Sequence, residues 1–256
     1  MRKSSHLIKN IKQEFKENGF VKVENLVSKF EIKLIKKDIN HISKILKEKK
    51  YKHLHLTEDG KINSIHDINK LKIKSYLKKF AKKKKLKKIV NNILDTQNTV
   101  VRNLEFFLKP KKTGQSAPFH QDNYFWNVKK AEALNVWIAC SVSNKNNGGI
   151  CYLKKSHTNG LLKHEISYKK GTSQKISEKD LNKLNYKKIF PNLNIGDCLI
   201  HHPEVIHGSY KNLSNNDRTG VVISFKKKSA QYDLEKIKIY RKRVNKSLEY
   251  IKRKKY

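Results

Sequence analysis

Residues 197–209, DCLIHHPEVIHGS, combine two short apolar runs with a turn at Pro203 and three histidines. Each apolar run has the length of a short strand, and Pro203 ends the first because proline cannot donate to a strand ladder. Further β-type runs of this kind stand on its two sides, at residues 100–108, 133–142, 149–153 and 219–225. Several short strands divided by turn residues favour a β-sandwich or barrel.

The chain outside these runs has the period of helices. Residues 1–98 are predicted to form a mostly helical flank, residues 99–226 the β core, and residues 227–256 a C-terminal helix. Ser28 and Glu31 form a capping box. The helix that they open carries one apolar face, made of Phe30, Leu34, Ile35, Ile39, Ile42 and Leu46. No composition shift marks a linker, so residues 1–256 are predicted to form a single domain.

Three polar stretches interrupt the apolar patterns. Residues 51–66 are irregular and are predicted to form a solvated loop in which His53, His55 and His66 bind no metal. The helical pattern resumes over residues 67–93, where Lys82 to Lys85 indicate a solvated helix face. Residues 155–190 form a long polar insertion, and a loop of this length often covers an active site. The sequence leaves open whether the insertion folds over a substrate or stays disordered.

The composition is strongly basic, with 59 Lys and Arg against 22 Asp and Glu and a net charge of +37. Such a charge fits a polyanionic partner such as nucleic acid. It also fits an AT-biased genome, since Lys, Asn and Ile are abundant along the whole chain. The basic residues lack the interleaved Arg and aromatic residues of a base-stacking surface. Nucleic acid is therefore not the expected partner.

Three cysteines, Cys140, Cys151 and Cys198, are too few and too irregular for a disulfide framework or a zinc site. They favour a reducing compartment. The first residues contain no apolar signal region, and no run of about 18 apolar residues occurs. We therefore expect a cytoplasmic protein without a membrane span, whose oligomeric state the sequence leaves open.

The sharpest local motif is PFHQD at residues 118–122. Residues two apart in a strand face the same side, so His120 and Asp122 can reach one ion. His207 is the third candidate ligand, and His201 and His202 are rivals of which one should face the core and one away. Two histidines and one carboxylate make the facial triad of non-haem Fe(II) oxygenases. Arg218, eleven residues after His207, can meet a carboxylate in a bidentate fork.

Beyond these residues, the sequence resembles the phytanoyl-CoA dioxygenase family of Fe(II)- and 2-oxoglutarate-dependent oxygenases. The similar segments appear in the family's order between residues 10 and 226. They are FKENGFV at 15–21 with ENL at 24–26, PFHQD at 118–122, VWIA at 136–139, NGG at 147–149, KSH at 155–157, and the stretch from Gly196 to Arg218. Lys155 stands where the family usually has a glycine before Ser-His.

The resemblance implies a mainly β fold with flanking helices, built on a double-stranded β-helix of the jelly-roll or cupin-like kind. It implies Fe(II) bound by His120, Asp122 and His207, and 2-oxoglutarate gripped by Arg218 with help from Ser209. Asn135 would add a polar contact to this cofactor site. Tyr124 and Trp126 would line the substrate side, with core packing as the alternative role.

The implied reaction consumes O2 and 2-oxoglutarate, releases succinate and CO2, and hydroxylates a small organic substrate. Asp122 favours hydroxylation, because relatives that halogenate lack this carboxylate. The basic composition suggests a substrate with an anionic group. Two other readings stay open, a basic nucleic-acid-binding protein and a barrel that binds a ligand without turnover.

Overall fold

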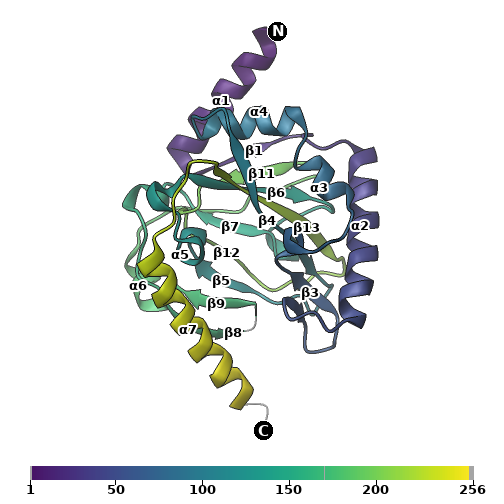
Figure 1. The fold of residues 1–256 in the computed structure, drawn as a ribbon, viewed down its shortest axis with the longest axis vertical. Helices are drawn as coiled ribbons and strands as arrows, with labels where there is room; N and C mark the ends of the chain where they lie inside the picture. Colours follow the sequence, from purple (N-terminus) through teal and green to yellow (C-terminus); the bar gives the residue numbers. More distant parts are fainter. Residues whose placement is uncertain (1, 170, 254–256) are drawn as a thin grey trace.

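The computed structural model describes residues 2–169 and 171–253, and its centre is a barrel formed by two antiparallel sheets (Figure 1). The larger sheet has, in spatial order, the strands β1 (Phe20–Val23), β11 (Cys198–His201), β6 (Ala133–Ala139), β13 (Arg218–Lys227), β4 (Thr99–Lys109), β3 (Ile62–Ile65) and β2 (Leu54–Leu56). The smaller sheet has, in order, β10 (Lys188–Ile189), β7 (Ile150–Leu153), β12 (His207–Ser209) and β5 (Ala117–His120). This arrangement confirms the predicted double-stranded β-helix.

Side-chain alternation divides the larger sheet into two faces. Along β6, Val136 and Ile138 belong to the main apolar core on the outer face, which the helices cover. Trp137, between them, belongs to a second cluster inside the barrel, together with Tyr152 of the smaller sheet. The barrel interior therefore collects the alternate residues of the strands, including their polar ones.

Seven α-helices and four short 3-10 helices surround the barrel in the described part of the chain. They are α1 (Arg2–Asn18), α2 (Lys29–Glu48), α3 (Tyr76–Phe80), α4 (Lys84–Ile93), α5 (Asp122–Trp126), α6 (Glu178–Lys183), α7 (Leu234–Arg253), η1 (Ile68–Lys70), η2 (Lys129–Ala131), η3 (Lys145–Asn147) and η4 (Ser156–Asn159). The capping box of Ser28 and Glu31 opens α2 as predicted. Helices α2, α3 and α4 cover the outer face of the larger sheet (Figure 1).

Two predictions for the helical flank are wrong. Residues 54–65 form the hairpin β2–β3, which extends the larger sheet instead of a solvated loop. Its strands have only three and four residues, LHL and INSI, so any apolar alternation is too short to mark a strand. The helical pattern of residues 67–93 is also broken into η1, α3 and α4, and Lys82 and Lys83 lie in the turn between α3 and α4.

Single positions depart from the predicted faces as well. Phe30 is 70% exposed, although it has the spacing of the buried face of α2, because it lies in the first turn, beyond the edge of the core. The C-terminal helix begins at Leu234, and its predicted end at residues 254–256 lies outside the described residues.

The insertion contains regular structure. Residues 155–190 include η4, the hairpin of β8 (Glu165–Lys169) and β9 (Thr172–Lys175), α6 and β10, while residue 170 is not described. The β8–β9 hairpin lies beside α7 and β5 (Figure 1). In the described part of the chain, no helix is long and apolar enough to cross a membrane.

Candidate metal and co-substrate site

Three side chains predicted as metal ligands meet inside the barrel. His207 of β12 is the register partner of His120 of β5, and their ring centroids are 4.4 Å apart. Asp122 lies against both, with Oδ1 3.6 Å from His120 Nε2 and Oδ2 3.7 Å from His207 Nε2. One ligand atom from each residue lies within 4.8 Å of the other two, so the group can hold one metal ion.

The reason for this convergence differs from the predicted one. Strand β5 ends at His120, and Asp122 is the first residue of α5, so the two ligands do not share a strand. Gln121 between them keeps an extended backbone, with φ −120° and ψ 128°. Its buried side chain donates from Nε2 to the carbonyls of Gly160 and Glu204, both at 2.7 Å, and this fixes the junction.

Backbone carbonyls orient both imidazoles. His120 Nδ1 lies 2.7 Å from the Pro118 carbonyl, and His207 Nδ1 lies 3.1 Å from the Val205 carbonyl. A proton on each Nδ1 would leave the lone pair of Nε2 free to bind a metal ion, as second-shell contacts do for metal-bound histidines. Burial lowers the pKa of His207 to about 3, which keeps this ring neutral and able to ligate.

The carboxylate of Asp122 is held from the larger sheet. Asn135 Nδ2 donates to Asp122 Oδ2 at 2.7 Å, and His201 Nε2 lies 3.1 Å from the same oxygen. Asn135 accepts from Ser224 Oγ at 2.5 Å, and Tyr152 OH lies 2.9 Å from His201 Nδ1. Burial opposes ionisation of Asp122, but the neighbouring histidines outweigh it, and its pKa lies well below the ordinary value.

Sequence reasoning placed Asn135 at the cofactor, whereas the structure places its amide on a predicted metal ligand. The sequence predicts His201 as a strand residue and as a less favoured rival of His207, and the structure places it at the end of β11. The prediction that one of the two adjacent histidines faces the core is confirmed, since His201 is buried beside Asp122. His202 turns away, and its ring lies 5.8 Å from that of Phe15.

At the first residue of β13, Arg218 places a buried cation inside the barrel. Its side chain is 2% exposed, Nη2 donates to the Gly148 carbonyl at 2.8 Å, and Nε has no hydrogen-bond partner. Among the described residues, no carboxylate lies within ion-pair distance of it. Burial lowers the pKa of Arg218 to about 9. A buried, incompletely paired guanidinium has an unmet need for an anion.

Lys109 of β4, the register partner of Arg218, was not singled out from the sequence. It is buried, and its Nζ donates to Ser209 Oγ at 2.7 Å and to the Tyr210 carbonyl at 2.5 Å. Ser209, predicted to assist Arg218, therefore lies in a group with two buried cations. A lysine at the end of the apolar run FFLK was the available signal, because alternation places it on the inner face with Phe107.

The two predicted substrate aromatics have other surroundings. Trp126 is 7% exposed and packs with Val128, Ala133 and Ala230, so the core-packing alternative describes it better. Tyr124 stacks on His164 with ring centroids 4.0 Å apart. Phe125, between them, faces the metal group and lies 5.4 Å from the His120 ring.

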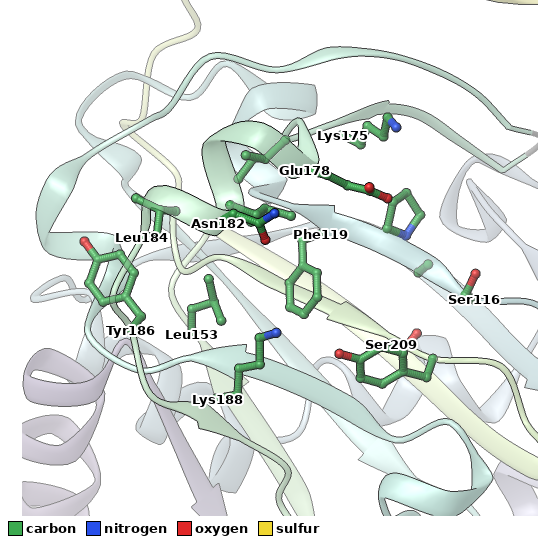
Figure 2. Close-up of a pocket in the computed structure, with 15 residues that line it drawn as sticks. Ser116, Phe119, Leu153, Lys175, Glu178, Asn182, Leu184, Tyr186, Lys188 and Ser209 are labelled. Atoms are coloured by element: carbon green, nitrogen blue, oxygen red, sulfur yellow. The ribbon is translucent and has the colours of Figure 1, made fainter.

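A separate pocket of about 370 Å³ lies on the other side of the smaller sheet (Figure 2). Phe119 lines it and His120 does not, because consecutive strand residues point to opposite faces. The segment around α6 covers this pocket, and Lys175 and Lys188 stand at its wall (Figure 2). None of the three predicted metal ligands lines this pocket, whereas Ser209 does.

Comparisons of sequence place these residues in a known family. The sequence model described as "Phytanoyl-CoA dioxygenase (PhyH)" matches residues 15–220. The peroxisomal phytanoyl-CoA dioxygenase of Bos taurus is 24% identical over 257 residues, which cover 94% of this chain and 75% of that protein. Phytanoyl-CoA dioxygenase of Arabidopsis thaliana is 26% identical over 177 residues, which cover 67% of this chain and 57% of that protein.

Solved structures share the fold at low identity. EctD from S. alaskensis, solved with 2-oxoglutarate and 5-hydroxyectoine, superposes with a TM-score of 0.71 at 18% identity over 87% of this chain and 77% of that one. The epimerase SnoN, solved with Fe3+, alpha ketoglutarate and nogalamycin RO, superposes with a TM-score of 0.69 at 14% identity over 89% of this chain and 86% of that one. At these identities the likeness concerns the fold alone.

Proposed function

This chain belongs to the phytanoyl-CoA dioxygenase family and is a 2-oxoglutarate-dependent dioxygenase, and from that premise we propose that it hydroxylates a small organic substrate. The observation that carries the proposal is the pairing of two arrangements in one barrel. A cluster of two histidines and one carboxylate lies in the interior, and an incompletely paired arginine lies at the start of β13.

The cluster fits Fe(II) by its donor set. His120, Asp122 and His207 offer two imidazole nitrogens and one carboxylate oxygen, which is the ligand set of non-haem Fe(II) oxygenases. Three protein ligands leave open positions for a co-substrate and O2. Asn135 and His201 both hold Oδ2 of Asp122, so Oδ1 is the oxygen that we assign to the ion.

The far carboxylate of 2-oxoglutarate fits the group around Arg218. A guanidinium binds a carboxylate through two parallel hydrogen bonds, and Arg218 has a free buried Nε for this purpose. Lys109 and Ser209 would add an ammonium and a hydroxyl group. When bound, Fe(II) and 2-oxoglutarate would allow O2 to oxidise the substrate, and 2-oxoglutarate would be converted to succinate and CO2. The protein orients the reactants and excludes water.

Asp122 also supports hydroxylation as the reaction type, because its carboxylate fills the position that a halide would need. The three cysteines are buried and unpaired in the structure, as a reducing compartment would require. A cytoplasmic location stays a prediction.

The test is an anaerobic titration of the metal-free protein with Fe(II) and 2-oxoglutarate, read by the visible charge-transfer band of the chelated keto acid. We expect the band in the wild type and its loss in His120→Ala. In Arg218→Ala we expect at least about a tenfold higher requirement for 2-oxoglutarate, the effect of losing one charge-assisted contact.

Matched controls separate these effects from general damage. His202→Ala removes a histidine that faces away from the cluster, and Arg241→Ala removes an exposed arginine of α7. Both should retain the wild-type band and titration. A folded wild-type protein without the band would refute the iron site, and the ligand-binding barrel would then be the better proposal.

A further inference from the structure

A second arginine, Arg102, lies near the other end of β4 from Lys109, where the register with β13 shifts between Asn103 and Val101 and leaves Arg102 without a register partner. Its side chain is half-buried. The neighbouring residue Asn103 belongs to a polar row that crosses the larger sheet at the level of the metal cluster. The row follows the strand register and consists of Asn103, Ser224, Asn135 and His201. Since Asn135 binds Asp122, this end of β4 adjoins the predicted iron position.

The guanidinium of Arg102 is stacked but not neutralised. Its carbon Cζ lies 4.4 Å from the ring centroid of Trp126, at the end of the helix that Asp122 opens. Its Nε is buried without a hydrogen-bond partner. Within residues 2–169 and 171–253, no carboxylate lies at ion-pair distance from it. Burial lowers the pKa of Arg102, and the charges of Glu105 and Asp122 raise it without cancelling this effect.

The nearest acidic residue on the same strand is already engaged. Glu105 Oε1 lies 2.7 Å from His66 Nδ1 and accepts from Asn103 Nδ2 at 3.0 Å. Glu105 lies on β4 and His66 directly follows β3, so the pair joins two neighbouring strands of the larger sheet. Glu105 therefore contacts His66 and Asn103, and it makes no ion pair with Arg102.

Solvent reaches this region. The side chains of Asp122, Glu105 and His66 remain 13%, 18% and 19% exposed, although all three lie in or beside the barrel. Arg102 is likewise only half-buried, so neither its side chain nor the cluster is sealed from solvent. A guanidinium with a buried, unpartnered Nε and no counter-ion is costly, and an anionic ligand reduces that cost. The ring of Trp126 lies beside the guanidinium, whose N–H groups can make a bidentate contact with an anion.

We propose that Arg102 binds an anionic group of the substrate, a carboxylate or a phosphate monoester, and thereby positions the substrate beside the predicted iron site. The proposal rests on the proposed function for the meaning of "substrate", but not for the binding itself. Arg218 would bind the co-substrate, and Arg102 would bind the substrate. A neutral analogue would leave Arg102 unpaired, which is a strong basis for discrimination.

Trp126 provides a local reporter, because the chain has only two tryptophans and the other, Trp137, lies 5.4 Å from Arg218. In a Trp137→Phe protein, the fluorescence of Trp126 is followed during titration of the metal-free form at 0.15 M salt. The probes are benzoate, octanoate and phenyl phosphate, each beside its uncharged partner, benzamide, octanamide or phenol. We expect at least one anion to change the fluorescence saturably, and its neutral partner to bind at least about tenfold more weakly.

Three variants make the result specific. Arg102→Gln should weaken the anion at least about tenfold, and Arg102→Lys should recover part of the loss, because it keeps the charge without the fork. Arg241→Gln removes an exposed arginine and should bind like the parent, which controls for attraction to a chain of charge +37. Thermal unfolding of each variant confirms that it is folded. The carboxylate and phosphate arms identify which anion the site takes.

Three outcomes would overturn the proposal. The anions could bind no more tightly than their neutral partners, anion binding could survive in Arg102→Gln, or no anion could bind. The charge-transfer band with Fe(II) and 2-oxoglutarate is measured separately in Arg102→Gln. Loss of the anion with a retained band supports the proposal. A missing wild-type band with Arg102-dependent anion binding would refute the proposed function and leave the anion site standing.

Discussion

His201 and His202 are adjacent in the sequence, but their side chains contact different parts of the protein. His201 Nε2 contacts Asp122, and Tyr152 completes the other side of its ring. His201→Ala should therefore free the Asp122 carboxylate and raise the dissociation constant for Fe(II) about 10–100-fold, the usual effect of losing an outer-shell partner. An anaerobic Fe(II) titration measures it. His202→Ala, one residue further on, should bind as the wild type does, and equal losses in the two variants would contradict the assignment.

His164, in the insertion, contacts the residue between the predicted ligands His120 and Asp122 through a neutral ring. Its Nε2 accepts from the Gln121 backbone N–H at 3.0 Å, and Nδ1 lies 2.9 Å from the Leu162 carbonyl. Burial lowers the pKa of His164 to about 4, against about 6.5 in the unfolded chain. Between these values the unfolded state binds the extra proton, so stability must rise with pH.

We therefore expect His164 to add up to about 1.4 kcal/mol per pH unit to the slope of unfolding free energy between about pH 4 and 6.5. Urea unfolding of the metal-free protein at several pH values measures this slope. His164→Gln keeps an acceptor for the Gln121 N–H but cannot titrate, so its slope should be shallower. An unchanged slope would show that His164 is protonated in the folded protein.

At the scale of elements, α7 contacts α5 through two side chains, Arg243 and Tyr240. Arg243 Nη1 donates to Tyr124 OH at 2.8 Å and to the His164 carbonyl at 2.7 Å. Tyr240, one turn earlier, lies 5.9 Å from the Phe125 ring and 3.2 Å from Ser173 Oγ. The helix therefore joins α5 to the β8–β9 hairpin on the side of His120.

Arg243→Met should release this attachment while keeping the length of the side chain. We expect faster amide hydrogen exchange in β8, β9 and α5, because local opening follows the loss of buried polar contacts. Arg241→Met, which changes an exposed residue of the same helix, should leave exchange unchanged. Equal exchange in wild type and Arg243→Met would mean that apolar packing alone holds α7.

The elements that could be predicted are those whose own residues carry a clear local signal. Strand β6 is a run of seven buried residues of which only Asn135 is polar, and α2 has both a capping box and an apolar face. The strands of the hairpin β2–β3 have three and four residues, too few for such a signal, and the hairpin joins the sheet through the pairing of β3 with β4. The break before α4 was not predicted, because the apolar period of residues 67–93 continues across the turn between α3 and α4. Tertiary packing imposes this turn.

The site divides in the same way. His120 and Asp122 could be found because a short motif contains both, and His207 and Arg218 because the turn and strand around them are distinctive. The local signals of Lys109 and His201 are weaker, since one only ends the apolar run FFLK and the other is one of two adjacent histidines. Lys109 lies in the site because β4 places it opposite Arg218 of β13, and His201 because β11 places it opposite Asn135 of β6. Strand register, which a single sequence does not reveal, decides both.

At the scale of the whole molecule, the net charge of +37 and the interior site contribute to ligand binding in different ways. Most lysines are exposed and distributed over helices and loops, whereas the cations that meet the barrel interior are few and individually placed. A diffuse positive field attracts any polyanion and is screened by salt within about 8 Å at physiological ionic strength. It cannot select a substrate, which is the role of fixed, buried groups.

Duplex DNA should therefore bind this protein only as a non-specific polyanion. We expect the logarithm of the binding constant for a 20-base-pair duplex to fall steeply and linearly with the logarithm of salt concentration. At 0.15 M salt the dissociation constant should lie in the range of about 1–100 µM, as for non-specific binding. Fluorescence anisotropy measures both quantities. Arg102→Gln and Arg218→Ala should change neither, because Arg102 is half-buried and Arg218 is buried, so neither belongs to the exposed basic surface. Nanomolar binding at 0.15 M salt, or competition between DNA and 2-oxoglutarate for Arg218, would instead place a nucleic acid at the site. The basic surface would then be part of substrate recognition.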